Sequence, residues 1–199
     1  MKSRKRRVTR ALLLHVLAEI EVLFYLPNDR QFWRRNELRA MGVEFGEEIR
    51  IGRDFRIYPP GNGNVKLGER FHVGDNVRLV DWCRIEIGDD FSGSYNVFIS
   101  TGSHLPSTLE PASKPIKIGD RVFVGIGAII LAGVTIGDDV IIGAGSVVTR
   151  DIPSNSVAVG VPARVIKKLD RSNIPAIWTW STSGPTPGWR KLHEGVEGK

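Results

Sequence analysis

The side chain best suited to acid–base chemistry is that of His104. Histidine titrates near neutral pH, so it can accept a proton from a hydroxyl or an amine as that group attacks another molecule. His104 begins a segment that contains Pro106, Pro111 and Pro115, and prolines are typical of loops. Loops on a rigid scaffold often carry function, which makes His104 the candidate catalytic base. The alternative is a surface histidine with no task, the more common fate of a lone histidine.

Two other reactive residues have weaker claims. Cys83 is the single cysteine, which excludes an internal disulfide and a cysteine-based metal cluster and fits a reducing compartment. Its place in the repeat described below predicts an inward-facing core residue. His72 occupies an outward position, where a solvated role or one at the rim of a substrate site is expected. Because His72 and His104 are the only histidines in the repeats, no three-histidine zinc site is expected there.

Composition suits one domain with a sizeable core, since 41% of the 199 residues are hydrophobic. The formal net charge is +6, but residues 1–10 alone hold six lysines and arginines and no acid. The rest of the chain is close to neutral, which argues against a nucleic-acid-binding protein.

A six-residue repeat determines which elements must position these side chains. Apolar residues recur at this spacing in two runs, Leu67, Val73, Leu79, Ile85, Phe91 and Val97, and then Ile118, Val124, Ile130, Ile136, Ile142 and Val148. Residues two apart in an extended segment point the same way, and the glycines that often follow permit tight corners. The spacing predicts a β-helix with three short sides and three repeats per coil. Each run supplies two coils, whose stacking buries the core.

The residues just before the inward ones are expected to point outward and so to form the outer surface. With three repeats per coil, Phe123 stacks on Ile141 and Ile129 stacks on Val147, which gives two apolar faces. An exposed apolar stripe usually marks an interface, so we expect the C-terminal coils to carry subunit contacts.

The chain divides into three expected parts: a basic, helical segment over 1–42, a β-helix over 43–169 with an extruded loop at 101–117, and a tail over 170–199. The apolar stretch 11–26 contains two glutamates and is too short to span a bilayer comfortably. A cytoplasmic protein is therefore expected. The N-terminal segment either contacts the inner face of the membrane through its basic residues or caps the open end of the β-helix. The tail, with Trp178, Trp180 and Trp189, is expected to be irregular.

The stretch from Ile99 to Lys168 resembles the hexapeptide-repeat acyltransferases, particularly galactoside and maltose acetyltransferases and polysaccharide O-acetyltransferases. The residues that carry the resemblance are ISTGSH at 99–104, KPIKIGDRVFVGIGAIILAGVTIGDDVIIGAGSVVTRDIP at 114–153 and VAVGVPARVIKK at 157–168. It implies an all-β, left-handed parallel β-helix, although the general preference for right-handed crossovers would argue otherwise. It also implies a homotrimer with active sites between subunits and acetyl-CoA as the donor.

The resemblance assigns roles to particular positions. His104 matches the histidine of the family's TGxH-type motif and is the implied base, and a backbone N–H near Gly125 and Ile126 is the implied oxyanion donor. A further set is implied to hold CoA: Gly125, Ile126, Gly127, Gly143 and Ala144 along the pantetheine arm, and Thr149, Arg150, Arg164 and Lys167 near the nucleotide. The glycines have an equally good explanation as corner residues, and Arg164 and Lys167 as solvated cations. Phe123 and Ile126 depart from the family's tryptophan and small polar residue.

The acceptor is harder to predict. Asp81, Trp82, Tyr95 and Asn96 are candidates to line its site near His104. Trp82 stands where related sugar enzymes tend to carry an acid, and it could instead stack on a sugar ring. The expected reaction is transfer of acetyl from acetyl-CoA to a hydroxyl of a sugar or polysaccharide precursor, with no metal. The alternatives are N-acetylation of an amino sugar nucleotide, modification of an antibiotic, and a non-catalytic trimeric scaffold.

Overall fold

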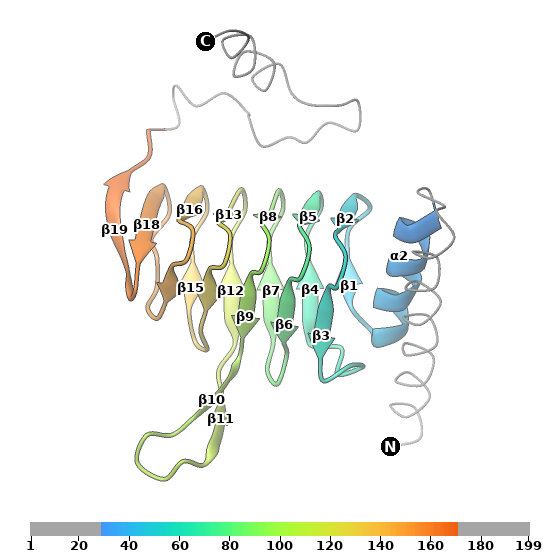
Figure 1. Cartoon of the computed structure of the whole chain (residues 1–199), viewed down its shortest axis with the longest axis horizontal. Helices are drawn as coiled ribbons and strands as arrows, with labels where there is room; N and C mark the ends of the chain where they lie inside the picture. The colour runs from blue at the N-terminus through green and yellow to red at the C-terminus, as the bar shows by residue number, and fades with distance from the viewer. Residues whose placement is uncertain (1–28, 171–199) are drawn as a thin grey trace, which may run out of the picture.

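The computed structural model describes residues 29–170, and α2 (Asp29–Met41) is the first element within them. After α2 the chain winds into a parallel β-helix, and the coils advance along the long axis of the molecule (Figure 1). The expected helix before residue 29 and the expected tail with its three tryptophans lie outside the described residues. In the part that is described, no helix is both long and apolar enough to cross a membrane.

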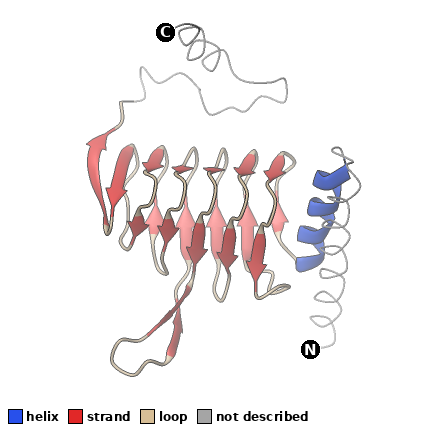
Figure 2. Ribbon diagram, viewed as in Figure 1, coloured by secondary structure: helices blue, strands red, loops and turns tan. Residues whose placement is uncertain are grey.

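Three parallel sheets form the sides of the β-helix, and we call them sheets A, B and C. Sheet A contains β1 (Glu44–Phe45), β4 (Val65–Leu67), β7 (Ile85–Ile87), β12 (Ile116–Ile118) and β15 (Thr135–Ile136). Sheet B contains β2 (Ile49–Ile51), β5 (Phe71–Val73), β8 (Ser92–Gly93), β13 (Phe123–Val124), β16 (Val140–Ile142) and β18 (Ser156–Gly160), with β19 (Ala163–Lys168) added antiparallel at its end. Sheet C contains β3 (Arg56–Tyr58), β6 (Arg78–Val80), β9 (Phe98–Ser100), β14 (Ile129–Ile130) and β17 (Val147–Val148). Followed from β1 through β2 and β3 to β4, the chain winds in a left-handed sense, which confirms the expected fold class (Figures 1 and 2).

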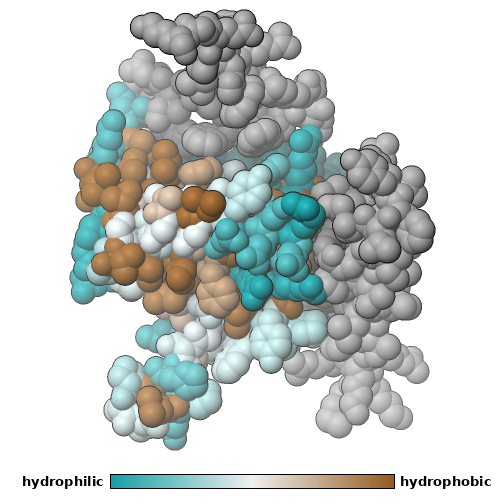
Figure 3. Space-filling view, in the orientation of Figure 1, coloured by the Kyte–Doolittle hydropathy of each residue, from teal (hydrophilic) through white to brown (hydrophobic). Residues whose placement is uncertain are grey.

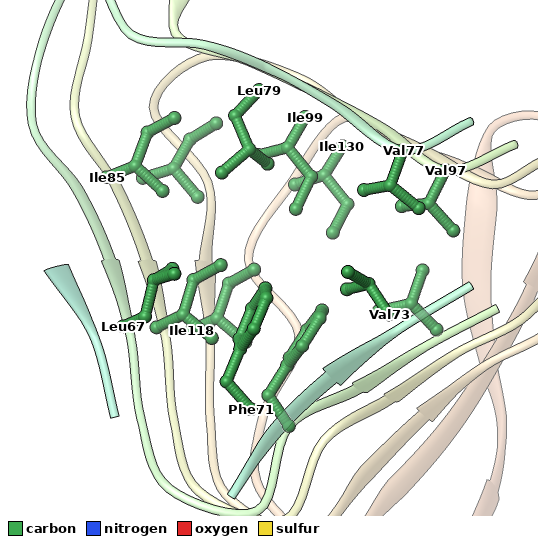
Figure 4. Packing of buried hydrophobic residues seen from close by; sticks show 14 of the residues in the cluster. Leu67, Phe71, Val73, Val77, Leu79, Ile85, Val97, Ile99, Ile118 and Ile130 are labelled. Atoms are coloured by element: carbon green, nitrogen blue, oxygen red, sulfur yellow. The ribbon is translucent and has the colours of Figure 1, made fainter. Parts of the chain in front are cut away.

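Alternation along each strand builds the core. In β4, Val65 and Leu67 are buried while Lys66 between them is exposed, as period-two strands require. The inward residues of successive coils stack in columns, and the rings of Phe71 and Phe91 lie 5.3 Å apart (Figure 4). Burying a side chain of this size contributes roughly 1.5–3 kcal/mol, so the stacked columns supply most of the driving force for folding.

The coil length departs from the expectation in the N-terminal half. In the C-terminal coils Ile118 pairs with Ile136, three repeats later, as predicted. In the earlier coils, however, Leu67 pairs with Ile87 rather than with Ile85, and Ile51 pairs with Val73. Each of these steps is longer than three repeats, so the expected coil length is wrong for the first run. The extra residues enlarge one corner, which the period of the buried residues did not reveal.

The corner between sheets A and B shows why glycine recurs in the repeat. A carboxylate of one coil accepts a hydrogen bond from a backbone N–H of the coil before it: Asp89 N–H donates to Asp120 at 2.9 Å, and Asp120 N–H donates to Asp138 at 2.9 Å. A Cβ on Gly88 would lie only 2.2 Å from the Asp120 oxygen. Glycine is thus needed there to admit the carboxylate of the next coil.

Helix α2 covers the open end of the β-helix beside β2 (Figure 2). Leu38 and Met41 are buried and belong to the same core as the strands. The guanidinium groups of Arg35 and Arg39 lie 5.5 and 5.3 Å from the centre of the Phe45 ring. The described part of the N-terminal segment therefore acts as a cap, one of the two expected roles.

Candidate active site

The enlarged corner, between sheets C and A, receives the extra residues of the N-terminal coils and the extruded loop. The segments that turn this corner are 59–64 after β3, 81–84 after β6 and 101–115 after β9. The third contains β10 (Gly102–His104) and β11 (Pro111–Ser113), which pair as an antiparallel hairpin that projects from the body (Figure 1). Because the three segments follow neighbouring strands of sheet C, they stack along one edge, and the hairpin begins beside the two shorter turns.

The hairpin aligns His104 with Trp82. A Cβ on Gly102 would lie 3.4 Å from the Trp82 ring, so the indole packs against this strand. Gly102 and His104 are two residues apart in β10 and so face the same side of the hairpin, with Cα atoms about 7 Å apart. His104 is exposed and Trp82 is 45% exposed. A molecule resting on the free part of the indole would thus lie within reach of the imidazole.

Thr101 anchors the base of the hairpin to the turn at 81–84. It is fully buried, its hydroxyl donates to the Val80 carbonyl at 2.8 Å, and the same hydroxyl accepts from the Cys83 N–H at 3.0 Å. Its own carbonyl accepts from the Lys114 N–H where the chain returns from the hairpin.

Cys83 lies in the 81–84 turn and is only half-buried, so the expectation of an inward core position is wrong. The added residues of the corner displace it from the repeat register.

A recess of about 550 Å³ lies between the hairpin and the two shorter turns. It is lined by Pro59, Asn62, Asn64, Trp82, Pro111, Ala112 and Ser113. The side-chain amides of Asn62 and Asn64 both donate to the Asp81 carbonyl, at 3.1 and 3.0 Å, which holds the turns together. Asp81 itself is only 1% exposed, so it belongs to the interior of the corner. An aromatic face beside amide groups suits a ring with one apolar face and several hydroxyls.

Tyr95 and Asn96 lie at a different corner, between sheets B and C. The Asn96 side chain accepts from Asn76 at 2.7 Å, and the Tyr95 carbonyl accepts from the Gly127 N–H at 2.9 Å. Within one chain, these two residues therefore accompany Gly127 and are not brought together with Trp82 and His104.

The glycine-rich part of the expected CoA site follows the same B–C corner. A Cβ on Gly125 would lie 2.6 Å from the Ala144 nitrogen, while Gly127 has a φ of +68° and open space around it. Corner geometry therefore explains both glycines. Gly143 and Ala144 occupy this corner in the next coil, and Ile126 projects from it with 49% exposure.

The expected nucleotide-binding residues are distributed more widely. Thr149 and Arg150 follow β17 at the C–A corner, whereas Arg164 and Lys167 are exposed on β19 opposite Val159 and Val157. The expected CoA residues thus occupy two corners and the terminal strand pair. A single chain does not gather them into one pocket.

His72 lies on the outer face of sheet B, between Arg50 and Ser92 in the neighbouring strands. Burial and then the nearby Arg50 lower the pKa of its imidazole, so His72 stays neutral below the usual pH for histidine. It is not part of the corner between sheets C and A that carries the hairpin.

Within residues 29–170, no group of three or more His, Cys, Asp or Glu side chains is placed to hold a metal ion.

Sequence reasoning did not identify several residues that build this corner: Asn62, Asn64 and Ser113, which line the recess, and Thr101 and Gly102, which support the hairpin and Trp82. A signal for the first two exists in the run PPGNGN at 59–64, because prolines, glycines and asparagines together mark an insertion between strands. Gly102 and Ser113 gain their places from hairpin pairing, for which the loop has no clear signal.

Comparison with known proteins adds to this picture. The family model for the bacterial transferase hexapeptide (six repeats) matches residues 115–150. The chain is similar to galactoside O-acetyltransferase of Escherichia coli (strain K12), with 40% identity over 142 residues that cover 69% of each chain. Among solved structures, it resembles a maltose O-acetyltransferase from Clostridium difficile 630, with 39% identity, a TM-score of 0.69, and coverage of 82% of this chain and 88% of that one. It also resembles a galactoside acetyltransferase in complex with coenzyme A, with 30% identity, a TM-score of 0.71, and coverage of 85% and 84%.

Proposed function

Because the chain belongs to the bacterial hexapeptide-repeat transferases, whose members similar to it include sugar acetyltransferases, we propose that it transfers acetyl from acetyl-CoA to a hydroxyl of a sugar. The observation that carries this proposal is that the exposed Trp82 packs on the same side of the hairpin as His104, whose pairing partner Pro111 lines the recess together with Trp82 and two asparagines. Trp82 provides a face for a sugar ring, and His104 provides the base.

The proposed chemistry needs no covalent enzyme intermediate. His104 takes the proton of the sugar hydroxyl as the oxygen attacks the thioester carbonyl, and the C–S bond then breaks. The protonated imidazole returns that proton to the CoA sulfur, so the products are an acetyl ester and free CoA. A backbone N–H at Gly125 or Ile126 would stabilise the oxyanion of the intermediate.

We also propose that the complete site forms between subunits of a homotrimer. The division of the expected CoA residues between two corners of one chain supports this, because a second copy could bring the B–C corner of one subunit to the C–A corner of another. The apolar columns described for the outer surface support assembly as well: Phe123 pairs with Ile141, and Ile129 pairs with Val147.

The decisive experiment measures release of the CoA thiol from acetyl-CoA with a panel of sugars, sugar nucleotides and amino sugars. His104→Ala should lower kcat by about 10²–10⁴-fold, the usual contribution of a general base. Ser103→Ala is the matched control, because Ser103 is also exposed on β10 but faces the other side of the hairpin. It should retain nearly full activity.

Each alternative predicts a different result. Amines are better nucleophiles than hydroxyls, so an N-acetyltransferase should acetylate amino sugars with a much smaller loss in His104→Ala. A non-catalytic scaffold should neither bind acetyl-CoA nor release thiol with any acceptor, and that result would refute the proposed function.

A further inference from the structure

The outer face of sheet C changes character along the β-helix. Its strand register forms one column of outward side chains that runs through Arg56, Arg78, Phe98, Ile129 and Val147. The first two are cationic and the last three apolar. Figure 3 shows this side of the molecule, with hydrophobic residues over the C-terminal coils and hydrophilic ones over the N-terminal coils. The two guanidinium groups therefore mark a distinct part of this face.

A groove of about 510 Å³ lies over the cationic part, between sheet C and α2. Apolar side chains such as Met41, Tyr58 and Phe98 line it together with Arg56 and Arg78. Its acidic residues are Asp54, which pairs with Arg56 at 3.0 Å, and Glu37, which is buried. Arg78 is exposed, and none of the ion pairs among residues 29–170 includes it. The groove thus presents a cation whose charge the described residues do not neutralise.

The groove adjoins the recess beside His104. Tyr58 and Pro60 line the groove while Pro59 between them lines the recess. On the next coil, β6 begins at Arg78 and leads directly to Trp82. Four residues of extended chain span at most about 13 Å, so a group bound at Arg78 lies within one or two sugar lengths of a ring on Trp82.

We propose that the acceptor is a phosphate-linked sugar, whose phosphate or diphosphate binds Arg78, with Arg56 beside it, while the sugar lies on Trp82. This proposal rests on the proposed function and names its substrate class. Arg56 and Arg78 are direct partners on neighbouring strands, about 4.8 Å apart at the backbone. Arg56 already pairs with Asp54, so Arg78 is the main anchor, and the planar array of donors on its guanidinium group suits the several charged oxygens of a phosphate.

The test measures binding of inorganic pyrophosphate, a probe that does not depend on the identity of the sugar, by isothermal titration calorimetry. Arg78→Gln should weaken its binding about 10-fold, the loss expected for one charge-assisted contact. Arg50→Gln is the matched control, because Arg50 is an exposed outward cation on β2, in a different sheet. It should bind pyrophosphate like the wild type. In thiol-release assays pyrophosphate should compete with the acceptor, and Arg78→Gln should leave the KM for acetyl-CoA unchanged.

Equal pyrophosphate binding by all three proteins would overturn the proposal. The proposal would also be overturned if pyrophosphate competed only with acetyl-CoA and not with the acceptor. Arg78 would then bind the phosphates of the donor. Equally efficient acetylation of a sugar and its 1-phosphate would also overturn it while leaving the sugar acetyltransferase intact. Conversely, failure of acetyl transfer with every acceptor would refute the proposed function, and the calorimetric comparison would still report on the anion site.

Discussion

At the scale of single residues, Trp82 distinguishes this site most clearly. Its indole packs on Gly102 and leaves nearly half of the side chain exposed toward the recess. Packing against the hairpin gives this aromatic residue a firm support. A stacking face in this position would hold the acceptor by its apolar side and leave the hydroxyls to neighbouring polar groups.

This arrangement predicts the effect of changing Trp82. Trp82→Ala should raise the KM for the acceptor about 2- to 10-fold, the value of an aromatic stacking contact of about 0.5–1.5 kcal/mol. The KM for acetyl-CoA should stay the same. Trp82→Phe keeps an aromatic face and should lose much less. Steady-state kinetics with both substrates varied would check this, and equal losses in the two variants would argue against stacking.

At the scale of the elements, the hydrogen bonds between coils at the A–B corner explain how the long insertion is tolerated. The carboxylate of Asp120 bonds to the Asp89 N–H, although the extruded hairpin separates these residues in sequence. The hydrogen bond therefore joins the coil before the hairpin to the coil after it, at a different corner. The hairpin can project without loss of coil register because the coil after it makes the same kind of backbone-to-carboxylate hydrogen bond at this corner as the later coils do.

Asp120→Ala should therefore lower the free energy of unfolding by about 1 kcal/mol, the usual net value of a hydrogen bond. In a chain of this size that corresponds to a fall in Tm of about 2–4 °C. Asp120→Asn keeps an oxygen acceptor at the same place and should fall less. Thermal unfolding followed by circular dichroism gives the comparison, and matching values for the two variants would show that the acceptor is unimportant.

At the scale of the whole molecule, assembly should depend on the apolar outer columns of the C-terminal coils. Ile129→Glu puts a charge into one column, and burying that charge in a subunit contact would be costly. We expect this variant to elute as a monomer in size-exclusion chromatography with light scattering, and the wild type as a trimer. Lys117→Glu, on the exposed outer face of sheet A, is the control and should remain trimeric. A monomeric wild type would contradict the proposed assembly.

The sequence by itself determined the architecture and the leading candidate for the base. The strict six-residue spacing from Ile118 to Val148 fixes the coil in that half, because each side of the prism needs one inward pair and one corner. His104 stood out because it begins the proline-rich segment that breaks this spacing. Both features are local along the chain, so no tertiary information was needed to find them.

The tertiary structure decided which residues meet. The first run keeps its period of six for buried positions, yet its coils are longer than three repeats, since an enlarged corner can shift the strand pairing without exposing an apolar residue. That shift moved Cys83 out of the core and brought Asn62 and Asn64 onto Asp81. Tyr95 and Trp82 lie at different corners, so they do not meet within one chain. Contacts between coils depend on the cumulative length of every corner, and a short local pattern does not record that length.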